Sequence, residues 1–219
     1  MPSKKSTVSI VVVILALSIT ISSLWYIAPV LTGPHIDDSW QIVCRTNDTW
    51  DPYSAQWIKD KYGGTIINIA EPQEYNQRGE NLLVIGGSAI LSEQAPWLEI
   101  WGPLAITKPH TFPDVRFEWD DDINDFKLVT PTAIYYPNQD NELGFIARGY
   151  DYTLRRHIVA CLGYNWYATA FGAKLLCTQW DKLVGNNTYV VFKCTSWGNV
   201  DPTQWSLSDF DGIILEYGG

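Results

Sequence analysis

The chain has 219 residues, of which 46% are hydrophobic and 18% are charged, and its net charge at pH 7 is −9. This hydrophobic content is sufficient for a packed core and argues against an intrinsically disordered chain. The excess of acidic side chains argues against a nucleic-acid partner, because phosphates require a basic face. Eleven tryptophans and twelve tyrosines are many for this length, and aromatic side chains both fill cores and line binding surfaces.

The N-terminal part of the chain contains a long apolar run. Residues 8–31 carry no charged side chain, and about 20 apolar residues suffice to cross a bilayer as a helix. Lys4 and Lys5 precede the run, and acidic residues follow it, so the positive-inside rule predicts a cytoplasmic N-terminus and an extracytoplasmic remainder. The sequence therefore predicts a single-pass membrane protein that contacts the lipid bilayer through residues 8–31.

Two alternatives exist for this segment. One is a cleaved signal peptide, although the run is longer than an ordinary signal core and lacks an A-x-A cleavage site. The other is a pilin-like helix processed after Lys5. With an uncleaved anchor, the chain divides into a cytoplasmic tip and transmembrane anchor at 1–32 and an extracytoplasmic domain at 33–219.

The exported part begins with a strand, a helix and two further strands. Asp51 as a cap and Pro52 in the first turn favour a helix that ends at Gly63-Gly64. Prolines and Asp-rich turns then mark residues 102–140 as a β-hairpin insertion. The expected strands are 40–45, 65–70, 81–85, 115–119, 126–136, 143–150, 157–162, 187–194 and 212–217, and the expected helices are 53–62, a proline-interrupted segment at 89–101, and 166–180.

Buried strands that alternate with helices are typical of the α/β class. The expected fold class is therefore α/β, with a mostly parallel sheet, helices on both of its faces, the β-hairpin insertion and one N-terminal transmembrane helix. In such sheets, ligands bind beyond the carboxyl ends of the strands.

Two strands end in glycine directly before a helical segment, at Gly86-Gly87-Ser88 and at Gly163-Tyr164-Asn165. Glycine permits a sharp turn, and a helix N-terminus holds anions or carbonyl groups. One interpretation is a ligand crevice lined by Gly87, Ser88, Asn165 and Thr169. The other interpretation is turn chemistry and helix capping, with Gly172 allowing close packing of the helix on the sheet.

Recognisable catalytic and nucleotide-binding motifs are absent from the sequence. It contains no G-x-G-x-x-G, P-loop or G-x-S-x-G pattern, and its three histidines are scattered. The acidic cluster at 118–125 departs from the EF-hand pattern and is typical of a solvated hairpin turn. We therefore expect no catalytic residue, no metal site and no cofactor.

Two kinds of residue agree with export from the cytoplasm. Asn47-Asp48-Thr49 and Asn186-Asn187-Thr188 match the N-glycosylation pattern. Four cysteines, an even number, permit disulfides outside the cytoplasm, but they also suit a core as free thiols. The glycosylation candidates are Asn47 and Asn186, and the disulfide candidates are Cys44, Cys161, Cys177 and Cys194.

Two segments resemble archaeal surface-layer and related cell-surface proteins. NLLVIGGSA at 81–89 is similar to their strand followed by Gly-Gly. LGFIARGYDYTLRRHIVACLGYNWYATAFGAKLL at 143–176 is similar to a second element, in which two strands precede a helix. The resemblance implies a surface location and an α/β fold, and it carries over no catalytic residue. Ser88 departs from the pattern, in which a small residue or proline follows Gly-Gly.

These features together predict a membrane-anchored extracellular surface protein with a structural or binding role in the cell envelope. Its expected partners, besides the bilayer, are other envelope proteins or glycans. One alternative is an anchored extracytoplasmic enzyme, such as a glycan hydrolase, that uses the strand-end crevice with paired carboxylates. A second alternative is a pilin-like filament subunit.

Overall fold

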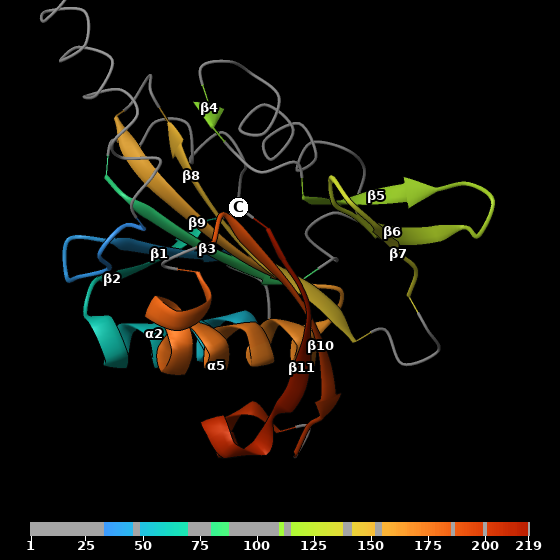
Figure 1. Cartoon of the computed structure of the whole chain (residues 1–219). Helices are drawn as coiled ribbons and strands as arrows, with labels where there is room; N and C mark the ends of the chain where they lie inside the picture. The colour runs from blue at the N-terminus through green and yellow to red at the C-terminus, as the bar shows by residue number, and fades with distance from the viewer. Residues whose placement is uncertain are drawn as a thin grey trace, which may run out of the picture. The chain divides into compact units, whose positions relative to one another are not determined.

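An eight-stranded mixed β-sheet forms the centre of the unit that spans residues 33–219 (Figure 1). The computed structural model describes residues 33–45, 49–69, 80–87, 110–111, 115–137, 142–151, 155–184, 187–198 and 201–218. The strand order is β11-β10-β8-β9-β3-β1-β2, and β4 pairs with β8. The strands of this main sheet are β1 (Gln41–Arg45), β2 (Thr65–Ile69), β3 (Leu82–Gly87), β4 (His110–Thr111), β8 (Leu143–Asp151), β9 (Arg156–Gly163), β10 (Tyr189–Ser196) and β11 (Asp211–Gly218).

The main sheet has a parallel half and an antiparallel half. Strands β2, β1, β3 and β9 run parallel to one another, whereas β8, β10 and β11 continue the sheet with antiparallel pairs. The central strands are buried on both faces: in β3, Leu83 and Ile85 join the core on one face, and Leu82 and Val84 join the core on the other. This double burial explains their continuous apolar sequence.

Two α-helices of the described part of the chain, α2 (Asp51–Tyr62) and α5 (Trp166–Leu183), pack against each other on one face of the main sheet (Figure 1). Helix α2 ends at Gly63, which has a φ of 83°, a conformation that glycine adopts without strain. Helix α5 begins after Asn165, whose side chain accepts a hydrogen bond from the Ala168 backbone N–H at 3.0 Å. The helix starts were predicted closely, but the residue before α2 is Trp50, and Asp51 is the first helical residue rather than the cap.

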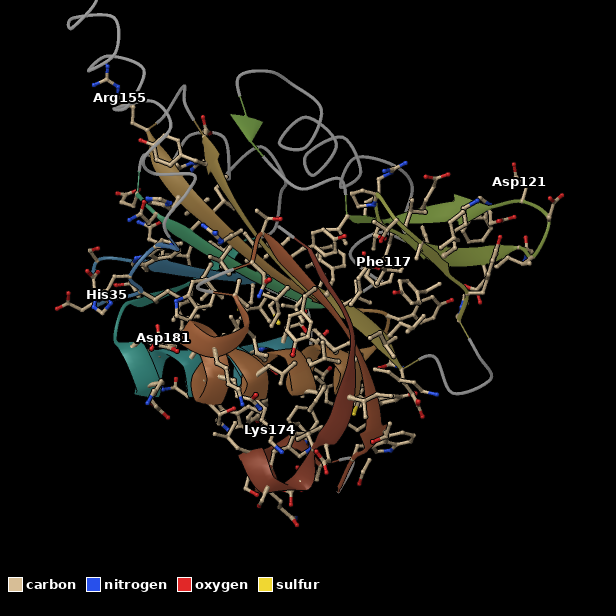
Figure 2. All side chains as sticks on the ribbon, viewed as in Figure 1. His35, Phe117, Asp121, Arg155, Lys174 and Asp181 are labelled. Atoms are coloured by element: carbon tan, nitrogen blue, oxygen red, sulfur yellow. The ribbon has the colours of Figure 1, made fainter. Side chains whose placement is uncertain are left out.

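A small antiparallel sheet covers the other face. It contains β5 (Arg116–Asp120), β6 (Asp125–Val129) and β7 (Ile134–Tyr135), and its buried residues Phe117, Phe126 and Leu128 join the second core. Phe117 lies between the two sheets, with its ring 5.5 Å from the ring of Phe145 on β8 (Figure 2). The strand run predicted at 115–119 corresponds to β5, whereas the run predicted as one strand at 126–136 is divided into β6 and β7 by a turn.

A carboxylate joins the small sheet to strand β11. Glu216 accepts hydrogen bonds from the hydroxyl groups of Thr130 at 3.0 Å, Tyr135 at 2.8 Å and Tyr189 at 2.5 Å. It also accepts one from the hydroxyl group of Thr132. We call these five residues the Glu216 cluster. They connect the turn after β6, β7, β10 and β11, and they fix the position of the small sheet on the main sheet.

The expected fold class was wrong in two respects. The main sheet is mixed rather than mostly parallel, because short connections join β8 to β9 and β10 to β11 without a crossover helix, and parallel neighbours need such a crossover. In addition, both described helices cover the same face, and the opposite face is covered by strands. Residues 89–101, where a third helix was expected, lie outside the described part.

The predicted single-pass membrane topology also requires correction. Within the residues that the structure describes, no helix is long and apolar enough to cross a membrane. The expected anchor at 8–31 lies outside those residues. The transmembrane helix, the bilayer contact and the localisation that depended on them are therefore not retained.

Candidate ligand-binding site at the strand ends

The two glycine-ended strands are neighbours and finish at the same edge of the main sheet. Strands β3 and β9 pair in parallel, with Gly86 opposite Leu162 and Gly87 opposite Gly163. Gly87 and Gly163 therefore lie at one edge of the sheet. Strand β1 is parallel to β3, so helices α2 and α5, which follow β1 and β9, both begin at this edge.

The residues predicted to line a crevice here have structural contacts. Thr169 is fully buried, and its hydroxyl donates to the Gly86 carbonyl at 3.0 Å, linking α5 to β3. Asn165 is half-buried and caps α5. Gly87 ends β3, and Ser88 lies outside the described residues. Thr169 therefore holds the helix to the sheet, and a ligand role for Gly87, Ser88 and Asn165 stays a prediction.

Gly163 is required by this close contact between β9 and α5. A Cβ atom at this position would collide with the backbone N atom of Thr169 and with its hydroxyl. Gly163 thus serves the packing of α5 on β9. Gly172 has the packing role that the alternative interpretation assigned to it, because a Cβ atom there would lie 2.6 Å from Sγ of Cys161.

Aromatic side chains gather at the same end of the two helices. They come from the first turns of α2 and α5, from the end of β10, and from the β10–β11 connection, which includes the short 3-10 helices η2 (Pro202–Gln204) and η3 (Leu207–Asp209). Ring contacts join them into one group. We call this group the aromatic cluster: Trp50, Tyr53, Trp57, Trp166, Tyr167, Trp197, Trp205 and Phe210.

Within the aromatic cluster, three indole rings form a continuous stack. The centroid of Trp166 lies 5.8 Å from that of Trp50, with an interplanar angle of 17°, and 5.1 Å from that of Trp205, with an angle of 15°. A second stack joins Tyr167 to Trp197 at 4.1 Å and 13°. Parallel stacking aligns the flat faces of these rings and fixes their orientation.

The aromatic cluster is buried at its base and exposed at its rim. Phe210 is fully buried, whereas Tyr53 is 36% exposed and Trp197 is 37% exposed. Trp50 and Trp166 are half-buried. Because large aromatic side chains at a wet surface contribute strongly to binding, this rim is the candidate ligand-binding surface.

The β10–β11 connection, which contributes Trp205 and Phe210 to the aromatic cluster, also carries polar side chains. Asp201 accepts hydrogen bonds from the Thr203 backbone N–H at 3.0 Å and hydroxyl at 2.7 Å, and from the Gln204 side-chain amide at 3.0 Å. The hydrogen bond from the Thr203 hydroxyl, and after it the bond from the Thr203 backbone N–H, lowers the pKa of Asp201 below its ordinary value. The carboxylate is therefore ionised and held in one orientation at neutral pH.

A second polar group lies beside Gly198, the residue that follows Trp197. Asp209 accepts hydrogen bonds from the Ser206 backbone N–H at 2.7 Å and hydroxyl at 3.0 Å, and the hydroxyls of Ser206 and Ser208 are 2.8 Å apart. A Cβ atom on Gly198 would lie 2.8 Å from Cβ of Asp209, so only glycine permits this approach. The segment after β10 and η3 therefore bring the Asp209 carboxylate close to the backbone of the residue after Trp197.

The cation Lys174 is hydrogen-bonded to the backbone of the β10–β11 connection. Its ammonium group on α5 donates to the backbone carbonyl of Phe210 at 2.5 Å (Figure 2). The charged groups that the β10–β11 connection itself contributes in the described residues are carboxylates. The candidate surface is thus aromatic and acidic.

The other predicted sites have separate locations. All four candidate cysteines are buried free thiols, and burial raises the pKa of Cys177 and of Cys194 to about 12. Asn47 and Asn186 lie outside the described residues, so their glycosylation stays a prediction. Among the residues that the structure describes, no cluster of His, Cys, Asp and Glu is arranged to hold a metal ion.

The acidic cluster at 118–125 lies in the turn between β5 and β6, where Asp121 is at the tip (Figure 2). Asp120 pairs with Lys127 at 3.0 Å, and the Trp119 indole N–H donates to Asp121 at 2.9 Å. His157, the second residue of β9, lies at the opposite edge of the sheet from the glycine turns. Its pKa is lowered by burial and by the nearby Arg148.

Sequence analysis missed the aromatic cluster as a site, although a signal was present. Aromatic residues stand at the predicted starts of the helices 53–62 and 166–180 and around the last turn before the final strand. Comparisons with known proteins provide no further guide: no protein-family model matches the chain, and no curated protein matches it. The resemblance to surface-layer proteins therefore stays a prediction.

Proposed function

We propose that this protein has a binding role and that it holds its ligand on the exposed rim of the aromatic cluster. The observation that carries the proposal is the stacked arrangement of Trp50, Trp166 and Trp205 at the strand-end edge of the sheet. This is the edge at which sheets with parallel strands ordinarily bind ligands.

The composition of the surface supports binding rather than ordinary core packing. Core side chains interdigitate and are excluded from water, whereas Tyr53 and Trp197 expose more than a third of their surface. The stacks orient these rings before any ligand arrives, which reduces the entropy lost on binding. A surface protein with a structural or binding role, as expected from the sequence, would use such a surface to hold glycans or other proteins.

Array binding tests this proposal. The purified protein is applied to a glycan array and to a peptide array, in parallel with Trp197→Ala and Trp119→Ala. Trp119 provides a matched control, because it is also an exposed indole, 45% exposed, but lies on β5 outside the aromatic cluster. We expect specific signals on at least one array that disappear with Trp197→Ala and persist with Trp119→Ala. Absence of specific signals, or equal loss in both variants, would overturn the proposal.

A further inference from the structure

We infer that the ligand of the aromatic cluster is an uncharged oligosaccharide that stacks on Trp197 and hydrogen-bonds to the side chains of the β10–β11 connection. The inference rests on the proposed binding function and specifies its ligand class. It combines three features of the surface: the available ring face, the polar groups beside it and their charge.

The ring face comes from Trp197. Tyr167 covers one face of this indole at a centroid distance of 4.1 Å. The 37% of Trp197 that is exposed therefore lies outside the face that Tyr167 covers. A sugar ring presents a flat patch of C–H groups, which carry partial positive charge and are attracted to the negative face of an aromatic ring.

The polar groups of the β10–β11 connection suit sugar hydroxyls. Asp209 and Ser208 offer carboxylate and hydroxyl oxygens, and Gln204 adds a side-chain amide. A carboxylate accepts at about four lone-pair positions, and the hydrogen bonds of Asp209 to Ser206 leave further positions for ligand hydroxyls. Both Asp201 and Asp209 are oriented by bonds within their own turns, so the acceptors are arranged before binding.

The charge of this rim selects against anionic ligands. Asp201, Asp209 and Asp211 all lie within or next to the connection, and these three carboxylates outnumber the ammonium group of Lys174, which donates to the carbonyl of Phe210. A sulfated or uronic-acid sugar would place its negative groups among these carboxylates, and like charges at such distances repel. The chain as a whole carries a net charge of −9, which adds to this repulsion.

Titration calorimetry with defined probes tests the inference. The neutral probes are cellotriose, maltotriose, mannotriose and chitotriose, the anionic probe is trigalacturonate, and the peptide probe is a proline-rich decapeptide. We expect measurable binding of at least one neutral trisaccharide and none of trigalacturonate or of the peptide. Trp197→Ala should weaken that binding at least about tenfold, and Trp197→Phe, which keeps a smaller ring, should weaken it less.

The control variant again is Trp119→Ala, which should leave the affinity unchanged. Circular dichroism and thermal unfolding of each variant establish that it is folded. Binding of trigalacturonate or of the peptide that is lost in Trp197→Ala would overturn the saccharide inference while supporting the proposed function. No binding of any of the neutral probes would overturn the inference, and the arrays described above would then decide the proposed function separately. Equal loss with Trp119→Ala would contradict both.

Discussion

The two faces of the main sheet use their polar side chains in opposite ways. On the face that carries the small sheet, the carboxylate of Glu216 receives four hydroxyl groups, so these polar groups satisfy one another. On the helix face, the polar side chains of the β10–β11 connection bond within short turns of a segment that also carries the partly exposed indole of Trp197. The polar groups of the Glu216 cluster are saturated by one another, whereas the aromatic cluster keeps part of its ring surface exposed to solvent.

This difference separates a structural contact from a binding surface. A carboxylate with four donors has little capacity left for a ligand, and it holds two layers of the protein together. Exposed rings beside oriented acceptors retain such capacity. We therefore place the binding function on the helix face, because the groups of the aromatic cluster keep a capacity for ligand contacts that the Glu216 cluster lacks.

Among the variants that test the difference between the two faces, Phe210→Ala should lower the free energy of unfolding the most. Phe210 is fully buried, and its ring contacts Trp57, Trp166 and Trp205 at centroid distances of 5.8, 6.4 and 5.2 Å. Its removal leaves a cavity under the aromatic cluster and should lower the free energy of unfolding by about 3–5 kcal/mol. Urea denaturation followed by circular dichroism measures the loss.

Trp119→Ala is the matched change on the other face. Trp119 contacts the ring of Phe126 at 5.1 Å but is 45% exposed, so its removal should cost less than about 1.5 kcal/mol. Similar costs for the two variants would show that the aromatic cluster is not anchored from below, and the contrast between a buried base and an exposed rim would fail.

The local elements of the fold were predictable because they depend on neighbouring residues. Pro52 and Gly63 mark the ends of α2, and Asn165 marks the start of α5. All strands of the main sheet that were expected from apolar runs appear within a few residues of their predicted bounds. The two-residue strand β4 was not predicted. Periodicity and turn residues carry this information directly.

Strand direction was predicted wrongly, although part of the answer was present in the sequence. Residues 151–156 between the expected strands 143–150 and 157–162 are too few for a crossover helix, and such a connection requires antiparallel neighbours. The site was missed for a different reason. Trp50, Trp166 and Trp205 are distant in sequence, and their stacking depends on the pairing of β1, β3, β9 and β10 through the sheet, which no local pattern specifies.

A smaller effect is expected from Glu216→Gln, which keeps the shape of the side chain and removes its charge. Glutamine has an NH2 group in place of one carboxylate oxygen. This group donates hydrogen bonds and cannot accept those of the surrounding hydroxyls. We expect the free energy of unfolding to fall by about 1–2 kcal/mol, because the cluster is partly exposed. Glu118→Gln, which breaks only exposed ion pairs with Arg116 and Lys127, should cost less than about 0.5 kcal/mol. Equal decreases in the free energy of unfolding for Glu216→Gln and Glu118→Gln would show that the Glu216 cluster stabilises the fold no more than a surface ion pair does.

The same carboxylate should make stability depend on pH. Partial burial acts to raise the pKa of Glu216, but the hydrogen bonds from Thr132, Tyr189, Tyr135 and Thr130 outweigh it, and the pKa lies below its ordinary value. A carboxyl with a lower pKa in the folded protein stabilises the fold above its unfolded pKa of about 4.3. This contribution is lost as the pH falls through the folded pKa. Unfolding measured between pH 7 and pH 3 should show a smaller acid loss in Glu216→Gln than in the wild type, and identical profiles would contradict the assignment.

The smallest effect, and one of opposite sign, is expected from Ser54→Ala on α2. Ser54 is 1% exposed, and its hydroxyl finds no hydrogen-bond partner among the residues that the structure describes. Alanine removes a buried polar group that gains nothing from folding, and it has a higher helix propensity than serine. The free energy of unfolding should therefore stay unchanged or rise by up to about 1 kcal/mol. Thr130→Val provides the contrast, because the Thr130 hydroxyl donates to Glu216, and its loss should lower the free energy of unfolding by about 1 kcal/mol. Urea denaturation could instead show that Ser54→Ala lowers the free energy of unfolding as much as Thr130→Val does. The Ser54 hydroxyl would then stabilise the fold as the Thr130 hydroxyl does. The two faces would use their polar groups alike, and this argument for placing binding on the helix face would fail.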